Sequence, residues 1–182
     1  MSVLRSGTHE KHMAVEKLPM VQYLLKGNIS EADYVVYLFE MLAIYQTLES
    51  LAQKAGLFDT LPGIARSERI AQDLAELSPQ YCGTLCRSTH SYINYLSELY
   101  NSSRRSELFA HVYVRHLGDM YGGKMISRVV PGSGRWYEFP NRAELLPNFN
   151  ALLSLDLTDE ALVAFEHYGN IFNELWDRIH TT

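Results

Sequence analysis

The stretch RHLGDMYGGKMIS, residues 115–127, holds three glycines and one aspartate inside a segment that otherwise has the pattern of a helix. Apolar residues recur at helical spacing on both sides of it. A glycine in a helix interior costs about 1 kcal/mol relative to alanine, so Gly118, Gly122 and Gly123 together cost roughly 2–3 kcal/mol. A helix tolerates such a cost where its backbone must bend or lie very close to a flat, bulky group.

Two interpretations of these glycines are open from this segment alone. Gly118 and Gly122 are four residues apart, and small residues at that spacing also let two helices pack closely. The other interpretation is a platform for a ligand. Asp119 lies in the middle of the motif, where a carboxylate needs a hydrogen-bonding partner or water, and we therefore expect the functional site here.

The composition indicates one domain covering residues 1–182 and argues against two classes of partner. The chain is long enough for a substantial core, and its formal net charge is −5 with a pI of about 5.8. It has no basic run, which argues against nucleic acid and against an anionic membrane surface. No apolar stretch reaches the roughly 18 residues of a membrane span, and the polar N-terminus lacks a signal-peptide core. We expect a soluble, cytoplasmic protein.

The two cysteines, Cys82 and Cys86, lie four apart on a predicted helix. Metal sites usually have tighter paired spacings and more ligands nearby. We therefore expect two reduced thiols without a function.

Helical periodicity covers almost the whole chain, and no segment has the period-2 alternation of a strand. Ser30 is a predicted N-cap, and Gly27 and Gly56 are predicted helix ends. We expect residues 131–157 to be irregular, with one helical turn near Arg142. The predicted helices cover residues 2–17, 19–25, 30–54, 62–77, 80–100, 104–130 and 158–179. The expected fold is a compact all-α bundle.

A second group of polar residues lies on the first predicted helix. Arg5, His9, His12 and Glu16 are spaced 4, 3 and 4 apart, so all four project from one face. A neutral imidazole can bind a metal through one nitrogen while the other donates to a carboxylate, and Glu16 is one turn beyond His12. Arg5 and His9 would then meet anionic groups of the ligand. A solvated helix face with an ordinary ion pair explains the same spacing.

Other catalytic signatures are missing from the sequence. It has no His-Glu-x-x-His motif, and no glutamate is followed three residues later by histidine, which argues against di-iron bundles. It also has no Gly-x-Ser-x-Gly elbow, no phosphate-binding glycine loop and no dinucleotide fingerprint.

Two stretches, THEKHMAVEK at 8–17 and YVRHLGDMYGGKM at 113–125, resemble heme oxygenase. That family has a proximal histidine on its first helix and a kinked distal helix with a Gly-Asp-x-x-Gly-Gly motif. IYQTLE at 44–49 and RIAQDL at 69–74 also match in kind and order, so the resemblance covers most of the chain. The short length and the GDMYGGKM variant look most like bacterial, cyanobacterial or phage forms.

The resemblance implies an all-α bundle with heme between the first, proximal helix and the kinked distal helix. His12 would ligate the iron of heme b, with Glu16 fixing the far nitrogen of that histidine. Gly118 and Gly122 would let the distal backbone lie against the porphyrin, and Asp119 would hold the distal water network. The remaining matched positions are Tyr45, Tyr92, Tyr113 and Arg115 around that network, Gly123 in the glycine motif, and Arg5 and His9 at the heme propionates.

The sequence departs from the family pattern at three places. His9 is a weaker cation at neutral pH than the lysine expected there. The stretch NFNALLSLDL (148–157) lacks the basic pair that the family usually carries before its last helix. Tyr121 replaces the usual small residue in the glycine motif. Lys124 and Arg128 are the basic residues on the distal helix that would compensate.

The resemblance implies oxidative opening of heme to biliverdin, ferrous iron and carbon monoxide, with O₂ and with electrons from ferredoxin or an NADPH-linked reductase. Heme would be both cofactor and substrate, and a downstream bilin reductase would be a further partner. Two alternatives stay open. One is a non-catalytic heme carrier or sensor of the same fold, and the other is a thiaminase-like enzyme, which would need Cys82 or Cys86 as its nucleophile.

Overall fold

The computed structural model of the chain describes residues 3–153 and 157–181, and these residues form helices and no strand. The prediction of an all-α bundle is confirmed. The helices are α1 (Val3–Glu16), α2 (Pro19–Leu25), α3 (Glu31–Lys54), α4 (Ser67–Leu77), α5 (Arg87–Asn101), α6 (Leu108–Val112), α7 (Gly118–Ile126), α8 (Arg142–Ala151) and α9 (Thr158–His180).

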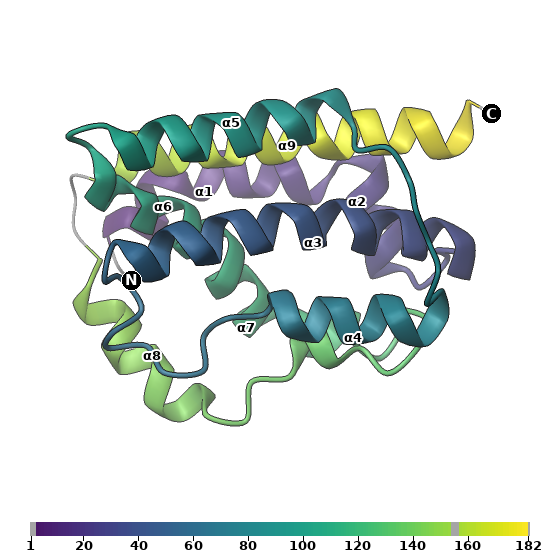
Figure 1. The fold of residues 1–182 in the computed structure, drawn as a ribbon, viewed down its shortest axis with the longest axis horizontal. Coiled ribbons are helices and arrows are strands. Elements are labelled where there is room, and N and C mark those ends of the chain that lie inside the picture. Colours follow the sequence, from purple (N-terminus) through teal and green to yellow (C-terminus); the bar gives the residue numbers. More distant parts are fainter. Residues whose placement is uncertain (1–2, 154–156, 182) are drawn as a thin grey trace.

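Helix α3 is the centre of the bundle. In Figure 1 it crosses the middle of the view, with α5 and α9 side by side above it and α4 below. It packs against α4, α5 and α6, whereas α9 packs against α1, α2, α5 and α6. By length and composition α3 could cross a membrane, but 56% of its most apolar window is buried inside the bundle. Its apolar character is therefore that of a core helix.

The predicted caps of α2 and α3 are confirmed. The Ser30 side chain accepts a hydrogen bond from the backbone N–H of Asp33 at 3.1 Å, which satisfies one free donor of the first turn of α3. Gly27 and Gly56 follow α2 and α3 with φ angles of +67° and +74°, the left-handed conformation that a glycine adopts without strain.

The predicted start of α4 at Pro62 is wrong, because the helix begins at Ser67. The loop before it is held by the Arg66 side chain, which donates to the carbonyl oxygens of Gly63 and Ile64. These side-chain bonds satisfy backbone acceptors that a helix would have satisfied, so the loop is stable without helical hydrogen bonds.

The predicted start of α5 at residue 80 is also wrong, because this helix begins at Arg87. The buried carboxylate of Glu40 on α3 accepts a hydrogen bond from the backbone N–H of Cys86 at 2.9 Å and so helps to fix the helix start. Both cysteines therefore precede the helix. Cys82 is exposed and Cys86 is buried, and both are free thiols, as expected.

The segment expected to be irregular, 131–157, contains more helix than predicted. A 3₁₀ turn, η3, covers Arg135–Tyr137, and α8 continues through Pro147. A proline normally interrupts a helix, but Leu145 and Phe149, one turn apart and both buried, anchor α8 in the core on both sides of it. Residues 154–156, in the neutral-to-acidic stretch 148–157, lie outside the described residues.

Candidate functional site

The segment 104–130, predicted as one helix, is divided into four consecutive parts, one of which is a turn of π-helix. A 3₁₀ turn, η1 (Arg105–Glu107), leads into α6, and a turn of π-helix, η2 (Tyr113–Leu117), separates α6 from α7, which ends at Ile126. A π-helical turn is one of the recognised causes of a bend in a helix and is frequent at functional sites. The bend therefore lies directly before the glycine motif.

The three glycines of the motif have two different structural roles. Among the residues that the structure describes, a Cβ atom added to Gly118 or to Gly122 would have no neighbouring atom within 4 Å, so no helix of this part of the chain packs against these two glycines. A Cβ atom on Gly123 would lie only 2.8 Å from Cδ1 of Tyr137. Close packing therefore explains Gly123 and does not explain Gly118 or Gly122, which face open space.

Large apolar side chains continue the open surface beside Gly118 and Gly122. Tyr121 and Met125 are 55% and 64% exposed, and their four-residue spacing places them on the same side of α7 as Gly118 and Gly122; Val129, in the turn after α7, is 39% exposed. The Tyr121 ring is covered in part by the Arg142 guanidinium, 5.1 Å from its centroid. An open backbone surface with an apolar border suits a flat, largely apolar ligand.

Asp119 is held at this surface by two donors from distant parts of the chain. Its Oδ2 atom accepts hydrogen bonds from the Tyr45 hydroxyl at 2.6 Å and from the Trp136 indole N–H at 3.0 Å. Burial raises the pKa of Asp119 to about 6, although both hydrogen bonds act in the opposite direction. Tyr45 was expected only as one of the residues around Asp119, and its direct hydrogen bond to that carboxylate is a finding of the structure. Trp136 was not predicted, because nothing in PGSGRWY marks that indole as a partner of a distant carboxylate.

Arg115, one turn before Asp119, is a buried cation without a carboxylate partner among residues 3–153 and 157–181. Its guanidinium lies 3.4 Å from the ring centroid of Tyr168 and 5.4 Å from that of Tyr92, so aromatic faces compensate part of its desolvation. Its Nε and Nη2 atoms have no hydrogen-bond partner within the described part of the chain. Tyr113, the first residue of η2, is buried as well.

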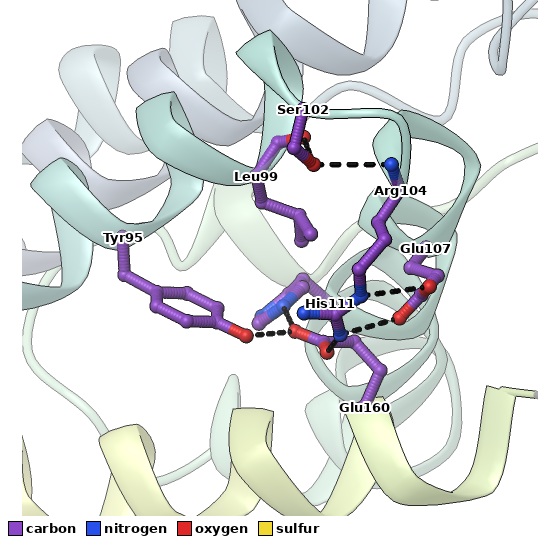
Figure 2. A network of polar contacts seen from close by, with 7 residues as sticks. All are labelled: Tyr95, Leu99, Ser102, Arg104, Glu107, His111 and Glu160. Carbon is purple, nitrogen blue, oxygen red and sulfur yellow. Dashed lines mark hydrogen bonds and ion pairs between the residues drawn. The ribbon is translucent and has the colours of Figure 1, made fainter.

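A polar network fixes the start of this distal segment (Figure 2). The buried carboxylate of Glu160 at the start of α9 accepts hydrogen bonds from Tyr95, from the Nε2 atom of His111 at 2.9 Å, and from Arg104. Although burial acts in the opposite direction, these donors lower the pKa of Glu160 to about 2. The Nδ1 atom of His111 faces the Tyr92 hydroxyl at 2.8 Å, which fits a neutral imidazole that donates to Glu160 and accepts from tyrosine. Burial lowers the pKa of His111 accordingly.

The four residues predicted to share one face of α1 lie on its outer side. Arg5, His9 and His12 are exposed and Glu16 is partly exposed, whereas Leu4 and Thr8 of the same helix are buried. The Nδ1 atom of His12 lies 3.7 Å from Oε1 of Glu16, with the two side chains 49% and 46% exposed. This distance suits an ion pair and exceeds that of a good hydrogen bond.

Helix α9 contacts both the polar residues of α1 and the distal segment that carries the glycine motif. The edge of the His12 ring meets Phe165 of α9, with their centroids 5.9 Å apart, and Arg115 lies over Tyr168, three residues further along the same helix. Consecutive turns of α9 thus contact the histidine of α1 and the arginine of the distal segment. The structure brings the two sequence motifs to the same part of the molecule.

The cysteines lie in a different environment. The Sγ atom of Cys86 is 3.8 Å from Nη1 of Arg178, which also contacts Glu40. Burial and the nearby Glu40 raise the pKa of the Cys86 thiol to about 11, which disfavours the thiolate that a nucleophile needs. Neither the aspartate nor the glycines of α7 contact this thiol.

Comparison with known proteins identifies the relatives of this chain. The family model described as Heme oxygenase matches residues 1–174. Heme oxygenase 2 of Oryctolagus cuniculus is 27% identical over 205 residues, which cover 95% of this chain and 65% of that protein. Heme oxygenase of Guillardia theta is 28% identical over 204 residues, covering 94% of this chain and 84% of that protein. The chain thus spans about two thirds of the length of the first relative and most of the second.

Solved structures share the fold at low sequence identity. Heme oxygenase-1 from Synechocystis sp. PCC6803 in complex with heme superimposes with a TM-score of 0.82 and 21% identity, over 98% of this chain and 94% of that chain. The heme oxygenase from Leptospira interrogans gives a TM-score of 0.82 at 22% identity, over 94% of this chain and 97% of that chain. The chain therefore shares the overall helical fold of these structures.

Proposed function

The chain belongs to the heme oxygenase family, and on that premise we propose that it opens heme oxidatively to biliverdin, ferrous iron and carbon monoxide. The observation that carries the proposal is the open surface at Gly118 and Gly122, which lies directly beside the buried carboxyl group of Asp119. A protein that only bound heme would have no need of a buried carboxyl group next to its ligand. Heme supplies the redox-active iron and is itself the ring that is opened.

On the proximal side, we assign His12 as the ligand of the heme iron. Its Nδ1 atom is oriented toward Glu16, which leaves Nε2 for the metal. The edge contact with Phe165 restricts rotation of the ring. The exposed Arg5 and His9 lie on the same helix face, where they would meet the heme propionates.

On the distal side, Gly118 and Gly122 allow the ring to approach the backbone, because neither carries a Cβ atom. Asp119 is the residue that takes up and releases protons, since a pKa of about 6 keeps both of its protonation states accessible near neutral pH. Tyr45 donates to Asp119, and the buried charge of Arg115 favours the carboxylate form.

Two other predicted ligand contacts are less direct. Gly123 packs against Tyr137 and so shapes the surface from behind, and Tyr113 is buried in the π-helical turn. We propose that both act through the shape of the distal wall. The electrons would come from ferredoxin or an NADPH-linked reductase in the cytoplasm, and a bilin reductase would receive the product.

The experiment that tests this function separates binding from turnover. Purified protein is titrated with heme while the Soret band is recorded, and ferredoxin, its reductase, NADPH and O₂ are then added. We expect a histidine-ligated spectrum followed by biliverdin and carbon monoxide. Binding without biliverdin would make the protein a heme carrier or sensor, and absence of binding would refute the proposal.

A variant pair tests the assignment of the iron ligand. His12→Ala should abolish the histidine-ligated spectrum, whereas His90→Ala, which removes an exposed histidine on α5, should leave it unchanged. An unchanged spectrum in His12→Ala would move the assignment to another histidine, such as His9 or His116.

A further inference from the structure

The two hydrogen-bond donors to Asp119 differ in whether they can also act as acceptors. Tyr45 on α3 and Trp136 on η3 both donate to the same oxygen, Oδ2, at 2.6 Å and 3.0 Å. A tyrosine hydroxyl can donate or accept a hydrogen bond, whereas the indole N–H can only donate. As long as the indole hydrogen bond is present, Oδ2 is bound as an acceptor.

Trp136 is fixed so that its indole N–H keeps this direction. Its side chain is fully buried, and its ring stacks on Tyr137 and Tyr37 with centroid distances of 4.7 Å and 5.7 Å. Its backbone N–H donates to Oδ2 of Asp73 at 2.9 Å, and Asp73 on α4 is itself buried. The indole is therefore held by its backbone and by two stacked tyrosine rings.

The second carboxyl oxygen of Asp119, Oδ1, differs from Oδ2 in its hydrogen bonding. Within residues 3–153 and 157–181, no hydrogen bond ends on Oδ1, so both protein donors occupy a single oxygen of the carboxyl group. A proton on Oδ2 would face the indole N–H and the Tyr45 hydroxyl, and only the hydroxyl can reverse its role.

We propose that Trp136, held by Asp73, is a positioning residue that reserves Oδ1 of Asp119 for proton exchange. The assignment rests on the proposed function, in which Asp119 handles the protons of heme cleavage. Trp136 acts through Asp119 and is itself fully buried. The carboxyl group then takes up and releases its proton on one defined oxygen.

The first test uses the free protein and does not depend on heme. The chain has two tryptophans, so ¹⁵N-labelled protein gives two indole N–H resonances, and Trp136→Phe identifies which one belongs to Trp136. We expect that resonance to shift with pH with the same midpoint as the ¹³C carboxyl signal of Asp119, and to stop responding at that midpoint in Asp119→Asn. Trp176, which stacks on His180, is the internal reference and should not respond to Asp119→Asn.

The second test compares two aromatic variants of the same turn. Because the indole hydrogen bond favours the carboxylate, Trp136→Phe should raise the pKa of Asp119 by about 0.5–1 unit, as expected for loss of one hydrogen bond. Tyr137→Phe removes a neighbouring buried hydroxyl that has no partner in the described part of the chain, and should leave the pKa of Asp119 unchanged. An unchanged pKa in Trp136→Phe, or an equal change in both variants, would overturn the proposal.

The pH dependence of biliverdin formation separates positioning from packing. We expect the profile of Trp136→Phe to move to higher pH together with the pKa of Asp119, whereas a purely structural role would lower the rate equally at every pH. A uniform loss would overturn the positioning role. If wild-type protein formed no biliverdin, the proposed function would fail, while both resonance tests of the Trp136–Asp119 hydrogen bond would still be decided.

Discussion

Replacement of Gly118 or Gly122 by alanine should stabilise the heme-free protein, whereas replacement of Gly123 should destabilise it. In Gly118→Ala and Gly122→Ala the new methyl group meets no atom of residues 3–153 and 157–181 within 4 Å, so only the helix propensity changes. Alanine is favoured over glycine in a helix by about 1 kcal/mol, and each variant should unfold at a temperature roughly 2–4 °C higher than wild type.

Gly123→Ala is the matched control within the same motif. Its methyl group would lie 2.8 Å from Cδ1 and 2.9 Å from Cβ of Tyr137, whose ring stacks on Trp136 and has little room to move. Such overpacking costs about 1–3 kcal/mol, which exceeds or cancels the gain of about 1 kcal/mol from propensity. We expect Gly123→Ala to be destabilised by up to about 2 kcal/mol.

The assay is urea or thermal unfolding of the three heme-free variants, followed by circular dichroism. Biliverdin formation is then measured on the heme-loaded proteins, where Gly118→Ala and Gly122→Ala should lose activity because their methyl groups occupy the space of the ring. Destabilisation of Gly118→Ala or Gly122→Ala to the extent of Gly123→Ala would refute the open surface. Full activity of both stabilised variants would refute its role as a heme platform.

Three further outcomes can be measured. Because the pKa of Glu160 is lowered to about 2, its contribution to stability is complete above the unfolded value of about 4.5 and is lost as the pH falls toward 2; Glu160→Gln should therefore flatten the acid unfolding curve over that range. Glu16→Gln should alter the iron–histidine stretching frequency of the heme complex through His12, and an unchanged Raman spectrum would exclude that coupling. Asp119→Ala should still bind heme but form biliverdin about 10²–10⁴ times more slowly, and a normal yield would exclude the proton-transfer role.

The helices that the sequence predicted well are those with local end signals. Ser30 at the start of α3 and the left-handed Gly27 and Gly56 act within a few residues, so they can be read without knowledge of the fold. The starts of α4 and α5 were misplaced, because side chains such as Arg66 and Glu40 determine them through contacts that the local pattern does not contain.

In the candidate site, too, features with a local sequence signal were predicted and features set by tertiary contacts were not. The spacing of His12 and Glu16 and the glycine motif were visible in the sequence; in the structure His12 and Glu16 lie 3.7 Å apart, and Gly118 and Gly122 face open space. The choice between packing and ligand approach for Gly118 and Gly122 needed the surrounding atoms. Trp136 was missed, because its partner is 17 residues away and the turn that joins them forms only in the folded chain.

The π-helical turn between α6 and α7 has a consequence for how this surface can change during evolution. All five residues of α6 are buried, whereas Gly118 and Tyr121 of α7 are exposed. Each residue advances an α-helix by about 100°, so deletion of one residue within Tyr113–Leu117 would rotate the whole of α7 by about that angle and turn a different side outward. Substitutions can adjust the chemistry of the distal wall one side chain at a time, but the length of this turn decides which side of α7 is presented at all. We therefore expect its length to tolerate change far less than its residue types do.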